Sequence, residues 1–252
     1  MKEFYTREFY KTYKDDSLES AREVVPIVLK FIQPKSVIDI GCGIGTWLSV
    51  FQENGIKEVL GVDGDYVDRN MLLIPEDRFL RFDLTRSFCI DDHFDLVVSL
   101  EVAEHIPHIN AEIFINSLTR LGPVVLFSAA IPFQGGTNHV NEQWPEYWIE
   151  HFQKEGYVVI DCIRKNIWGN SNVNYYYAQN MFLFVKQEYL ENYPILKKEY
   201  QINTVSYYSM VHPSKWMEAN DLGNKPLKDV FFALPIIVRN GLKRRLNKII
   251  QK

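Results

Sequence analysis

Cysteine is scarce in this chain, and no long hydrophobic run interrupts it. The three cysteines, Cys42, Cys89 and Cys162, cannot all pair with one another, and their spacing matches no zinc-binding framework. Free thiols in a reducing compartment are the simplest interpretation. The most apolar stretch, residues 230–238, is too short to span a membrane. Residues 1–13 are charged and aromatic and lack the apolar core of a secretory signal, so we expect a cytoplasmic protein.

The chain also lacks an excess of positive charge. Across its 252 residues, 32 acidic side chains oppose 28 Lys and Arg side chains, for a net charge of −4. The last acidic residue is Asp229 and six basic residues follow it, so the first 229 residues carry a charge of about −10. An acidic body is poorly suited to nucleic acid, whose affinity for proteins comes mostly from cationic contacts with phosphate. A hydrophobic content of 46% excludes an intrinsically disordered chain and predicts a large globular domain.

Apolar periodicity predicts alternating strands and helices over the first half of the chain. A helix over 17–32 precedes the β-branched strand 36–40, which leads into a glycine-rich loop and a helix over 47–53. The remaining elements of this half are strands at 59–62, 79–82, 94–100 and 124–128 and a helix at 111–119. Such alternation requires crossover connections, and it predicts an α/β fold with a doubly wound, mostly parallel sheet covered by helices on both faces.

The pattern changes after the fifth strand. A helix over 144–153 is followed by two strands, 157–164 and 179–186, which predict an antiparallel hairpin at one edge of a seven-stranded sheet. The expected divisions of the chain are a helical segment and candidate lid over 1–35, the α/β domain over 36–186, and a helical appendage over 187–252.

The appendage ends in a basic amphipathic pattern. Leu242, Leu246, Ile249 and Ile250 follow helical spacing opposite a basic face. Such a helix suits the anionic surface of a membrane, which would place the protein at its inner face. It also suits docking on the domain or on a second copy of the chain in a homodimer, so both alternatives stay open.

Three alternating glycines, Gly41, Gly43 and Gly45, follow the strand 36–40 directly. In open parallel sheets, the turn after the first strand usually makes the closest contact with a nucleotide ligand. A nicotinamide dinucleotide site has the spacing G-x-G-x-x-G, whereas this loop has G-x-G-x-G with Thr46 in place of the third glycine. Asp39 would repel a pyrophosphate and attract the ammonium group of an amino acid. These features favour an amino-acid-bearing nucleoside over a dinucleotide.

The sequence DIGCGIG at 39–45 resembles the first motif of the S-adenosylmethionine-dependent methyltransferases with the doubly wound, Rossmann-like fold, and the resemblance extends over about 36–186. It implies that S-adenosylmethionine is the cofactor. It also implies that Asp63 holds the ribose hydroxyls and that Asp83 binds the adenine amino group. The expected cofactor-binding set is Asp39, Gly41, Gly43, Gly45, Asp63, Asp83, Leu84 and Leu100.

A second motif, E-x-x-E-H, follows the strand 94–100. On an α-helix, Glu101, Glu104 and His105 would share one face, and two carboxylates beside an imidazole suit a divalent cation. His139 lies in a loop that should return to the same edge of the sheet. His108 is an alternative to one of these histidines.

This set resembles the metal-binding group of small-RNA 3′-terminal 2′-O-methyltransferases and of some ubiquinone-pathway O-methyltransferases. The resemblance implies that Mg²⁺ or Mn²⁺ is held by Glu101, Glu104, His105 and His139. The alternative is an E-H pair that packs without metal, in which case His139 is the candidate general base. The expected catalytic residues are His139, Glu104 and His105.

Aromatic and amide side chains cluster after the fifth strand, a combination that suits a sugar or a nucleoside. The segments GTNHVNEQWPEYW and VHPSKW resemble parts of bacterial methyltransferases of capsule and other surface-glycan synthesis. This resemblance implies an O-methyltransferase that acts on a carbohydrate or nucleotide-linked sugar. The rival functions are RNA 2′-O-methylation, which the acidic body disfavours, and a non-catalytic, cofactor-binding partner subunit.

Overall fold

The computed structural model describes residues 7–88, 90–202 and 207–221, together with residues 231, 232, 234, 235, 238 and 239. Its contacts divide the chain into two units, Met1–Met210 and Val211–Lys252, so the border expected after residue 186 falls inside the first unit. The described part of the second unit contains the helix α8 (Pro213–Asn220). The expected basic helix around 242–250 and Cys89 lie outside the described residues. No helix in the described part of the chain is long and apolar enough to cross a membrane.

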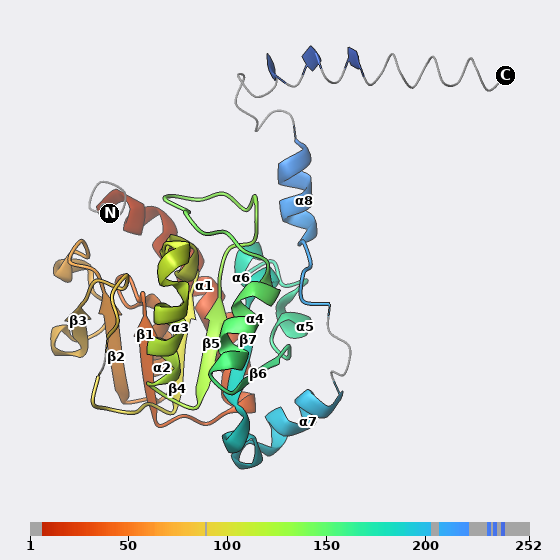
Figure 1. Cartoon of the computed structure of the whole chain (residues 1–252). Helices are drawn as coiled ribbons and strands as arrows, with labels where there is room; N and C mark the ends of the chain where they lie inside the picture. Colours follow the sequence, from red (N-terminus) through yellow and green to blue (C-terminus); the bar gives the residue numbers. More distant parts are fainter. Residues whose placement is uncertain are drawn as a thin grey trace. The chain divides into compact units, whose positions relative to one another are not determined.

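The first unit contains the expected seven-stranded sheet, in which the strand order is β3-β2-β1-β4-β5-β7-β6 (Figure 1). Five neighbouring strands are parallel, whereas β7 runs antiparallel to both β5 and β6. The doubly wound sheet with an antiparallel edge is therefore confirmed. The strands are β1 (Ser36–Ile40), β2 (Glu58–Asp63), β3 (Phe79–Arg81), β4 (Leu96–Leu100), β5 (Val124–Ser128), β6 (Tyr157–Ile160) and β7 (Phe182–Lys186).

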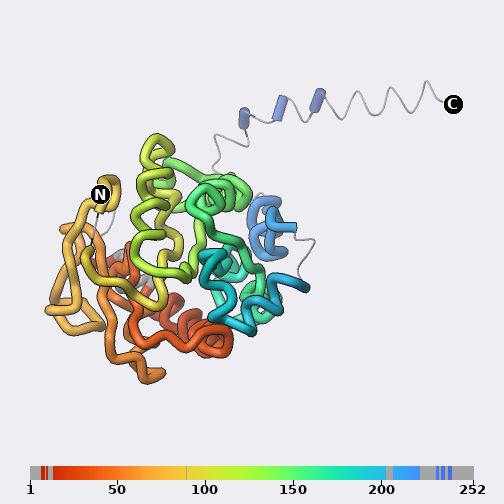
Figure 2. Tube along the Cα trace, turned by 60° about the horizontal axis from the view of Figure 1, so that its bottom comes forward, coloured from red at the N-terminus to blue at the C-terminus, as the bar shows by residue number. Residues whose placement is uncertain are grey.

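Helices cover both faces of this sheet, with α1 and α3 on opposite sides (Figure 2). The helices of the first unit are α1 (Arg7–Phe31), α2 (Thr46–Glu53), α3 (Ala111–Thr119), α4 (Pro145–Lys154), α5 (Arg164–Ile167), α6 (Tyr175–Asn180) and α7 (Pro194–Ile202). Short 3₁₀ turns lie at Arg69–Met71, Glu76–Arg78, Ala103–His105, His108–Asn110 and Gln187–Asn192.

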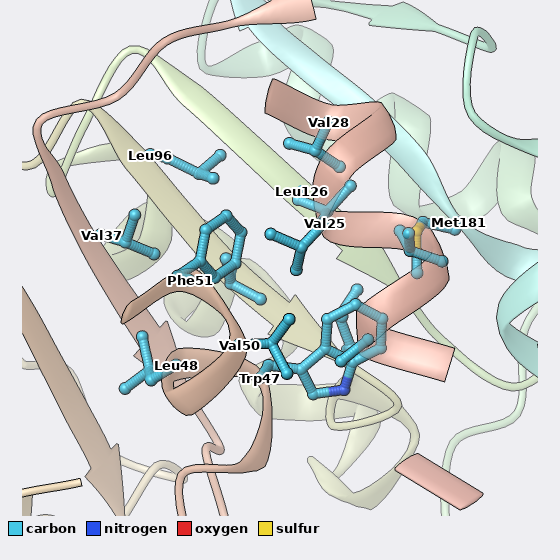
Figure 3. Packing of buried hydrophobic residues seen from close by; sticks show 14 of the residues in the cluster. Val25, Val28, Val37, Trp47, Leu48, Val50, Phe51, Leu96, Leu126 and Met181 are labelled. Atoms are coloured by element: carbon cyan, nitrogen blue, oxygen red, sulfur yellow. The ribbon is translucent and has the colours of Figure 1, made fainter. Parts of the chain in front are cut away.

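Two hydrophobic clusters, one on each face, hold the layers together. Successive strand residues point to opposite faces, so Val37 packs in one cluster and its neighbour Ile38 in the other. In the first cluster, Val25 and Val28 of α1 and Phe51 of α2 pack over the strands (Figure 3). The second cluster joins the sheet to α3 and α4. Burial on both faces explains why the central strands are continuous apolar runs in the sequence.

Three expected element boundaries were wrong. The first helix begins at Arg7 and continues through Pro26, where we expected it to begin at residue 17. The strand expected over 157–164 ends at Ile160, because the chain turns where the guanidinium of Arg164 binds Asp161 and the carbonyl of Gln179. The last strand begins at Phe182 rather than at 179, because the preceding residues form α6.

Candidate active site

The glycine loop joins β1 to α2, and its backbone requires glycine. Gly41, Gly43 and Gly45 all have positive φ, at 86°, 55° and 82°. A Cβ on Gly41 would lie 2.3 Å from Cγ2 of Val102, and one on Gly45 would lie 2.9 Å from Cγ1 of Ile74. The loop therefore brings bare backbone to the carboxyl end of β1, where a ligand can approach closely.

Two buried aspartates flank this loop. Asp63, at the end of β2, accepts hydrogen bonds from the backbone N–H groups of Gly43 and Gly64, each at 2.6 Å, and from the hydroxyl of Tyr66. Burial raises the pKa of Asp63, although these hydrogen bonds oppose the shift. Burial also raises the pKa of Asp39 well above its usual range, and the charge of Asp63 adds to the effect. A cationic group placed here would relieve this repulsion.

The remaining residues of the expected cofactor set line the same cavity as the glycine loop. Leu84 and Leu100 are buried there. Asp83 is half-exposed and accepts hydrogen bonds from the backbone N–H of Thr85, at 3.1 Å, and from its hydroxyl, at 2.7 Å. The Thr85 hydroxyl is the main reason that the pKa of Asp83 is lowered, so this carboxylate is ionised and faces the cavity from the end of β3.

One continuous cavity of about 870 Å³ extends from the glycine loop to His139. Residues from the first strand-helix turn, the end of β4, the loop after β5 and the helices α1 and α6 form its walls. The glycine loop and His139 therefore line one shared space, and a group transfer between two bound molecules requires such an arrangement.

The E-x-x-E-H segment differs locally from the expected α-helix. Glu101 has a φ of 54°, and Ala103–His105 form a single 3₁₀ turn. Glu101 therefore does not share a helical face with Glu104 and His105. Its carboxylate accepts hydrogen bonds from the side-chain amides of Gln134, at 2.7 Å, and Asn180, at 3.1 Å. Burial raises the pKa of Glu101 to about 7.

The structure brings the other three residues of the expected set together. Among the described residues, one ligand atom each of Glu104, His105 and His139 lie within 4.8 Å of one another. The two imidazole rings meet edge to face with centroids 4.9 Å apart. Oε1 of Glu104 lies 3.9 Å from Nε2 of His139.

Glu104 is the most unusual member of this cluster. Its side chain is fully buried, and neither carboxylate oxygen has a hydrogen-bond partner in the described part of the chain. Burial raises its pKa well above the usual range, and the charge of Glu101 raises it further. A buried polar atom without a partner is costly, which indicates that a ligand or an ion completes this site.

Nδ1 of each histidine lies within hydrogen-bond distance of an oxygen atom. Nδ1 of His105 lies 3.1 Å from the carbonyl oxygen of Asn138, which can only accept, so the ring proton is on Nδ1. Nδ1 of His139 lies 2.9 Å from Oε1 of Glu142. Burial lowers the pKa of His105 to about 4, so this imidazole is neutral near physiological pH, the form that binds a metal.

Sequence reasoning missed several polar residues of the site. Gln134 and Asn180 hold Glu101, and Gln179 joins them through hydrogen bonds of 3.2 Å to Gln134 and 3.0 Å to Asn180. Glu142 holds His139. A glutamate three residues after a histidine was a usable signal, whereas the contacts of Asn180 depend on the tertiary fold.

The expected aromatic cluster divides between the cavity and the core. The side chains of Tyr175, Tyr176 and Tyr177 line the cavity, whereas Trp148 packs against Phe127 in the second cluster. His108, the alternative ligand, packs on the ring of Tyr147, at a centroid distance of 5.4 Å, and is not among the cavity residues. Asn170 and Asn172 bind Glu23 of α1.

Residues 13–161 match the model of a family described as a methyltransferase domain. No match was found among curated proteins.

The solved structure of CalS10 with bound S-adenosylmethionine, an amino pentose methyltransferase from Micromonospora echinaspora, is 13% identical, with a TM-score of 0.55 over 72% of this chain and 97% of CalS10. The sugar N-methyltransferase KedS8 from Streptoalloteichus sp ATCC 53650 is also 13% identical, with a TM-score of 0.55 over 71% of this chain and 91% of KedS8. An O-methyltransferase family protein from Burkholderia thailandensis is 15% identical, with a TM-score of 0.52 over 71% of this chain and 59% of that protein. At these identities the likeness concerns the fold.

Proposed function

The chain belongs to the methyltransferase domain family, and on that premise we propose that it transfers the methyl group of S-adenosylmethionine to a hydroxyl oxygen of a carbohydrate or nucleotide-linked sugar. The observation that carries the proposal is the cluster of Glu104, His105 and His139, which faces the same cavity as the glycine loop. Asp39 would attract the ammonium group of the cofactor, and Asp63 and Asp83 its ribose and adenine.

The chemistry of this cluster fits a divalent cation. Glu104 offers a buried carboxylate whose oxygens have no hydrogen-bond partner within the described residues, and His105 and His139 offer neighbouring imidazoles. These three residues would hold Mg²⁺ or Mn²⁺, which would lower the pKa of the acceptor hydroxyl and orient it. Glu101 is the fourth residue of the proposed set, although its carboxylate is held by Gln134 and Asn180 in this structure.

The transfer forms a bond between the acceptor oxygen and the methyl carbon, breaks the bond from that carbon to the sulfonium sulfur, and releases S-adenosylhomocysteine. The cavity residues orient the two reactants, and the hydroxyl proton must leave. Without a cation, Nε2 of His139 would take this proton, because Glu142 holds the ring from Nδ1.

A sugar acceptor is supported by the tyrosines of α6 in the cavity wall, since aromatic faces commonly recognise sugars. The further narrowing to capsule or surface-polysaccharide synthesis rests on the resemblance of the segments around His139 and Trp216.

Calorimetric titration and a transfer assay test the proposal together. We expect the purified chain to bind S-adenosylmethionine and S-adenosylhomocysteine. We also expect it to methylate a member of a nucleotide-sugar panel, identified by the mass of one added methyl group. Chelator should abolish transfer, and Mn²⁺ should restore it. Transfer to a terminal 2′-hydroxyl of RNA, or to a sugar amine, would contradict the proposed acceptor.

Transfer that is unchanged in excess chelator would refute the cation and leave His139 as the base. The variant His139→Ala tests whether a loss of transfer comes from the missing histidine, as metal ligand or as base, or from weaker cofactor binding. We expect this variant to bind S-adenosylhomocysteine normally and to lose transfer by about a hundredfold or more.

A further inference from the structure

The loop between β5 and α4 carries His139, and one side chain organises much of it. The carboxylate of Glu142 accepts hydrogen bonds from Nδ1 of His139 at 2.9 Å, from the backbone N–H of Gly135 at 2.7 Å and from the backbone N–H of Phe133 at 2.8 Å. Three donors on one carboxylate fix both ends of the segment that carries the histidine.

The same loop is also hydrogen-bonded to the backbone of Glu104, a member of the cluster that contains His139. The backbone N–H groups of Val140 and Asn141 both donate to the carbonyl oxygen of Glu104, each at 2.9 Å. The position of His139 along the chain is therefore fixed relative to Glu104. The rotation and the tautomer of its ring depend on Glu142.

The backbone of the loop is strained in a way that needs support. Phe133 has a φ of 67°, a left-handed conformation that is costly for a bulky residue, and its side chain is 91% exposed. No packing of the Phe133 ring can offset this strain, whereas the bond from its N–H to Glu142 can.

Space on the other side of the ring comes from a glycine. Gly136 has a φ of 156°, and a Cβ at this position would lie 2.2 Å from Nε2 of His139. Gly135 also has a positive φ, of 73°, but a Cβ there would meet nothing within 4 Å. Of these two glycines, only Gly136 is required by the imidazole.

We propose that Glu142 and Gly136 are positioning residues for His139: Glu142 holds the proton on Nδ1, and Gly136 leaves room for the ring, so that the lone pair of Nε2 faces Glu104 and His105. The inference rests on the proposed function of this cluster and adds to it two residues that act through His139. Carboxylates that bind the second nitrogen of a metal-binding histidine fix its tautomer and orientation, and their loss typically weakens metal binding or activity by about 10- to 100-fold.

The tautomer of His139 can be measured without an acceptor or a metal. Two-bond ¹H–¹⁵N correlation spectra of histidine-labelled protein, recorded at a pH where the ring is neutral, distinguish an Nδ1 proton from an Nε2 proton. The His139→Ala variant assigns the signals. We expect an Nδ1 proton in the wild-type chain and a mixture or an Nε2 proton in Glu142→Ala. Glu142→Gln should recover part of the Nδ1 form, because its amide oxygen can still accept.

The change of tautomer should be accompanied by changes in kcat and in metal affinity. In Glu142→Ala we expect kcat to fall by about 10- to 100-fold and Mn²⁺ to bind about tenfold more weakly. Binding of S-adenosylhomocysteine should change by less than about twofold, because Glu142 does not line the cavity. Glu150→Gln, an exposed carboxylate on α4, is the matched control and should match the wild type in every readout.

The glycine pair separates the effect of ring space from that of backbone strain. Gly136→Ala and Gly135→Ala both place a side chain at positive φ, but only the first meets His139. We expect the Gly136 variant to lose far more transfer than the Gly135 variant. Equal losses would refute the role of Gly136.

An Nδ1 proton on His139 in Glu142→Ala, with kcat unchanged, would overturn the role of Glu142. These outcomes differ from a failure of the proposed function. If the wild-type chain binds no Mn²⁺ and methylates no sugar, yet the tautomer changes in Glu142→Ala, the proposed function fails and the positioning role stands.

Discussion

At the scale of single residues, the site contains buried carboxyl groups that reduce the stability of the folded protein when no ligand is bound. Asp39 shows this most clearly, because burial and the neighbouring Asp63 both raise its pKa. A carboxyl group with a raised pKa in the folded state ionises more readily when unfolded, so its ionisation costs stability as the pH rises above the ordinary aspartate range. Near neutral pH, this cost is present in the empty protein.

Asp39→Asn should therefore change stability and binding in opposite directions. The amide removes the like charge beside Asp63, so we expect thermal unfolding of the empty protein at pH 7 to occur at an equal or higher temperature. On the proposed role of Asp39, the cofactor loses the carboxylate that would face its ammonium group, so its affinity should fall about tenfold or more. Scanning calorimetry and titration measure the two effects.

Asp77→Asn, at an exposed position outside the cavity, is the control and should change neither quantity. If Asp39→Asn binds the cofactor as tightly as the wild type, the ammonium group lies elsewhere.

At the scale of elements, the glycine loop shows how the fold dictates a sequence. Gly41→Ala would force a side chain into a backbone with a φ of 86° and against Val102. We expect a loss of about 2–3 kcal/mol in the free energy of unfolding, measured in urea. The double variant with Val102→Ala should recover the steric part and retain the cost of the positive φ.

Gly55→Ala provides the comparison, because Gly55 has a φ of 94° and a Cβ there would meet nothing within 4 Å. It should cost about 1 kcal/mol, the strain alone. A similar loss in Gly41→Ala and Gly55→Ala would mean that Val102 moves aside freely.

The elements also show what the sequence could and could not predict. The strands were recognisable because β-branched runs alternate with helical periods, and the glycine loop because its spacing follows a strand directly. The 3₁₀ turn after β4 was not predictable, because spacing alone does not show that Glu101 adopts a positive φ between Leu100 and Val102. The helix α6 was missed because Gln179 and Asn180 are held by a polar network whose members are distant in sequence.

At the scale of the whole molecule, a buried carboxyl group links stability to ligand binding. Glu104 is fully buried without a hydrogen-bond donor among the described residues, and this arrangement destabilises the empty protein. A cation that binds only the folded chain would stabilise it, by about 2.7 kcal/mol at a concentration one hundred times its Kd. For a domain of this size, that corresponds to a rise of roughly 5–10 °C in Tm.

Glu104→Gln should reverse this relationship. Glutamine does not ionise, so the stability that wild-type Glu104 loses above the ordinary glutamate pKa, because the carboxyl group ionises more readily in the unfolded chain, is not lost, and we expect a higher Tm than that of the wild-type protein without metal. It also removes the proposed carboxylate ligand, so Mn²⁺ should no longer raise the Tm, whereas S-adenosylhomocysteine, for which we propose the glycine loop as binding site, should still do so. Thermal scans of wild type, Glu104→Gln and the control Glu150→Gln, each with and without both ligands, measure all of these effects. A wild-type Tm that rises with S-adenosylhomocysteine but not with Mn²⁺ would show that Glu104 serves the acceptor or the proton rather than a cation.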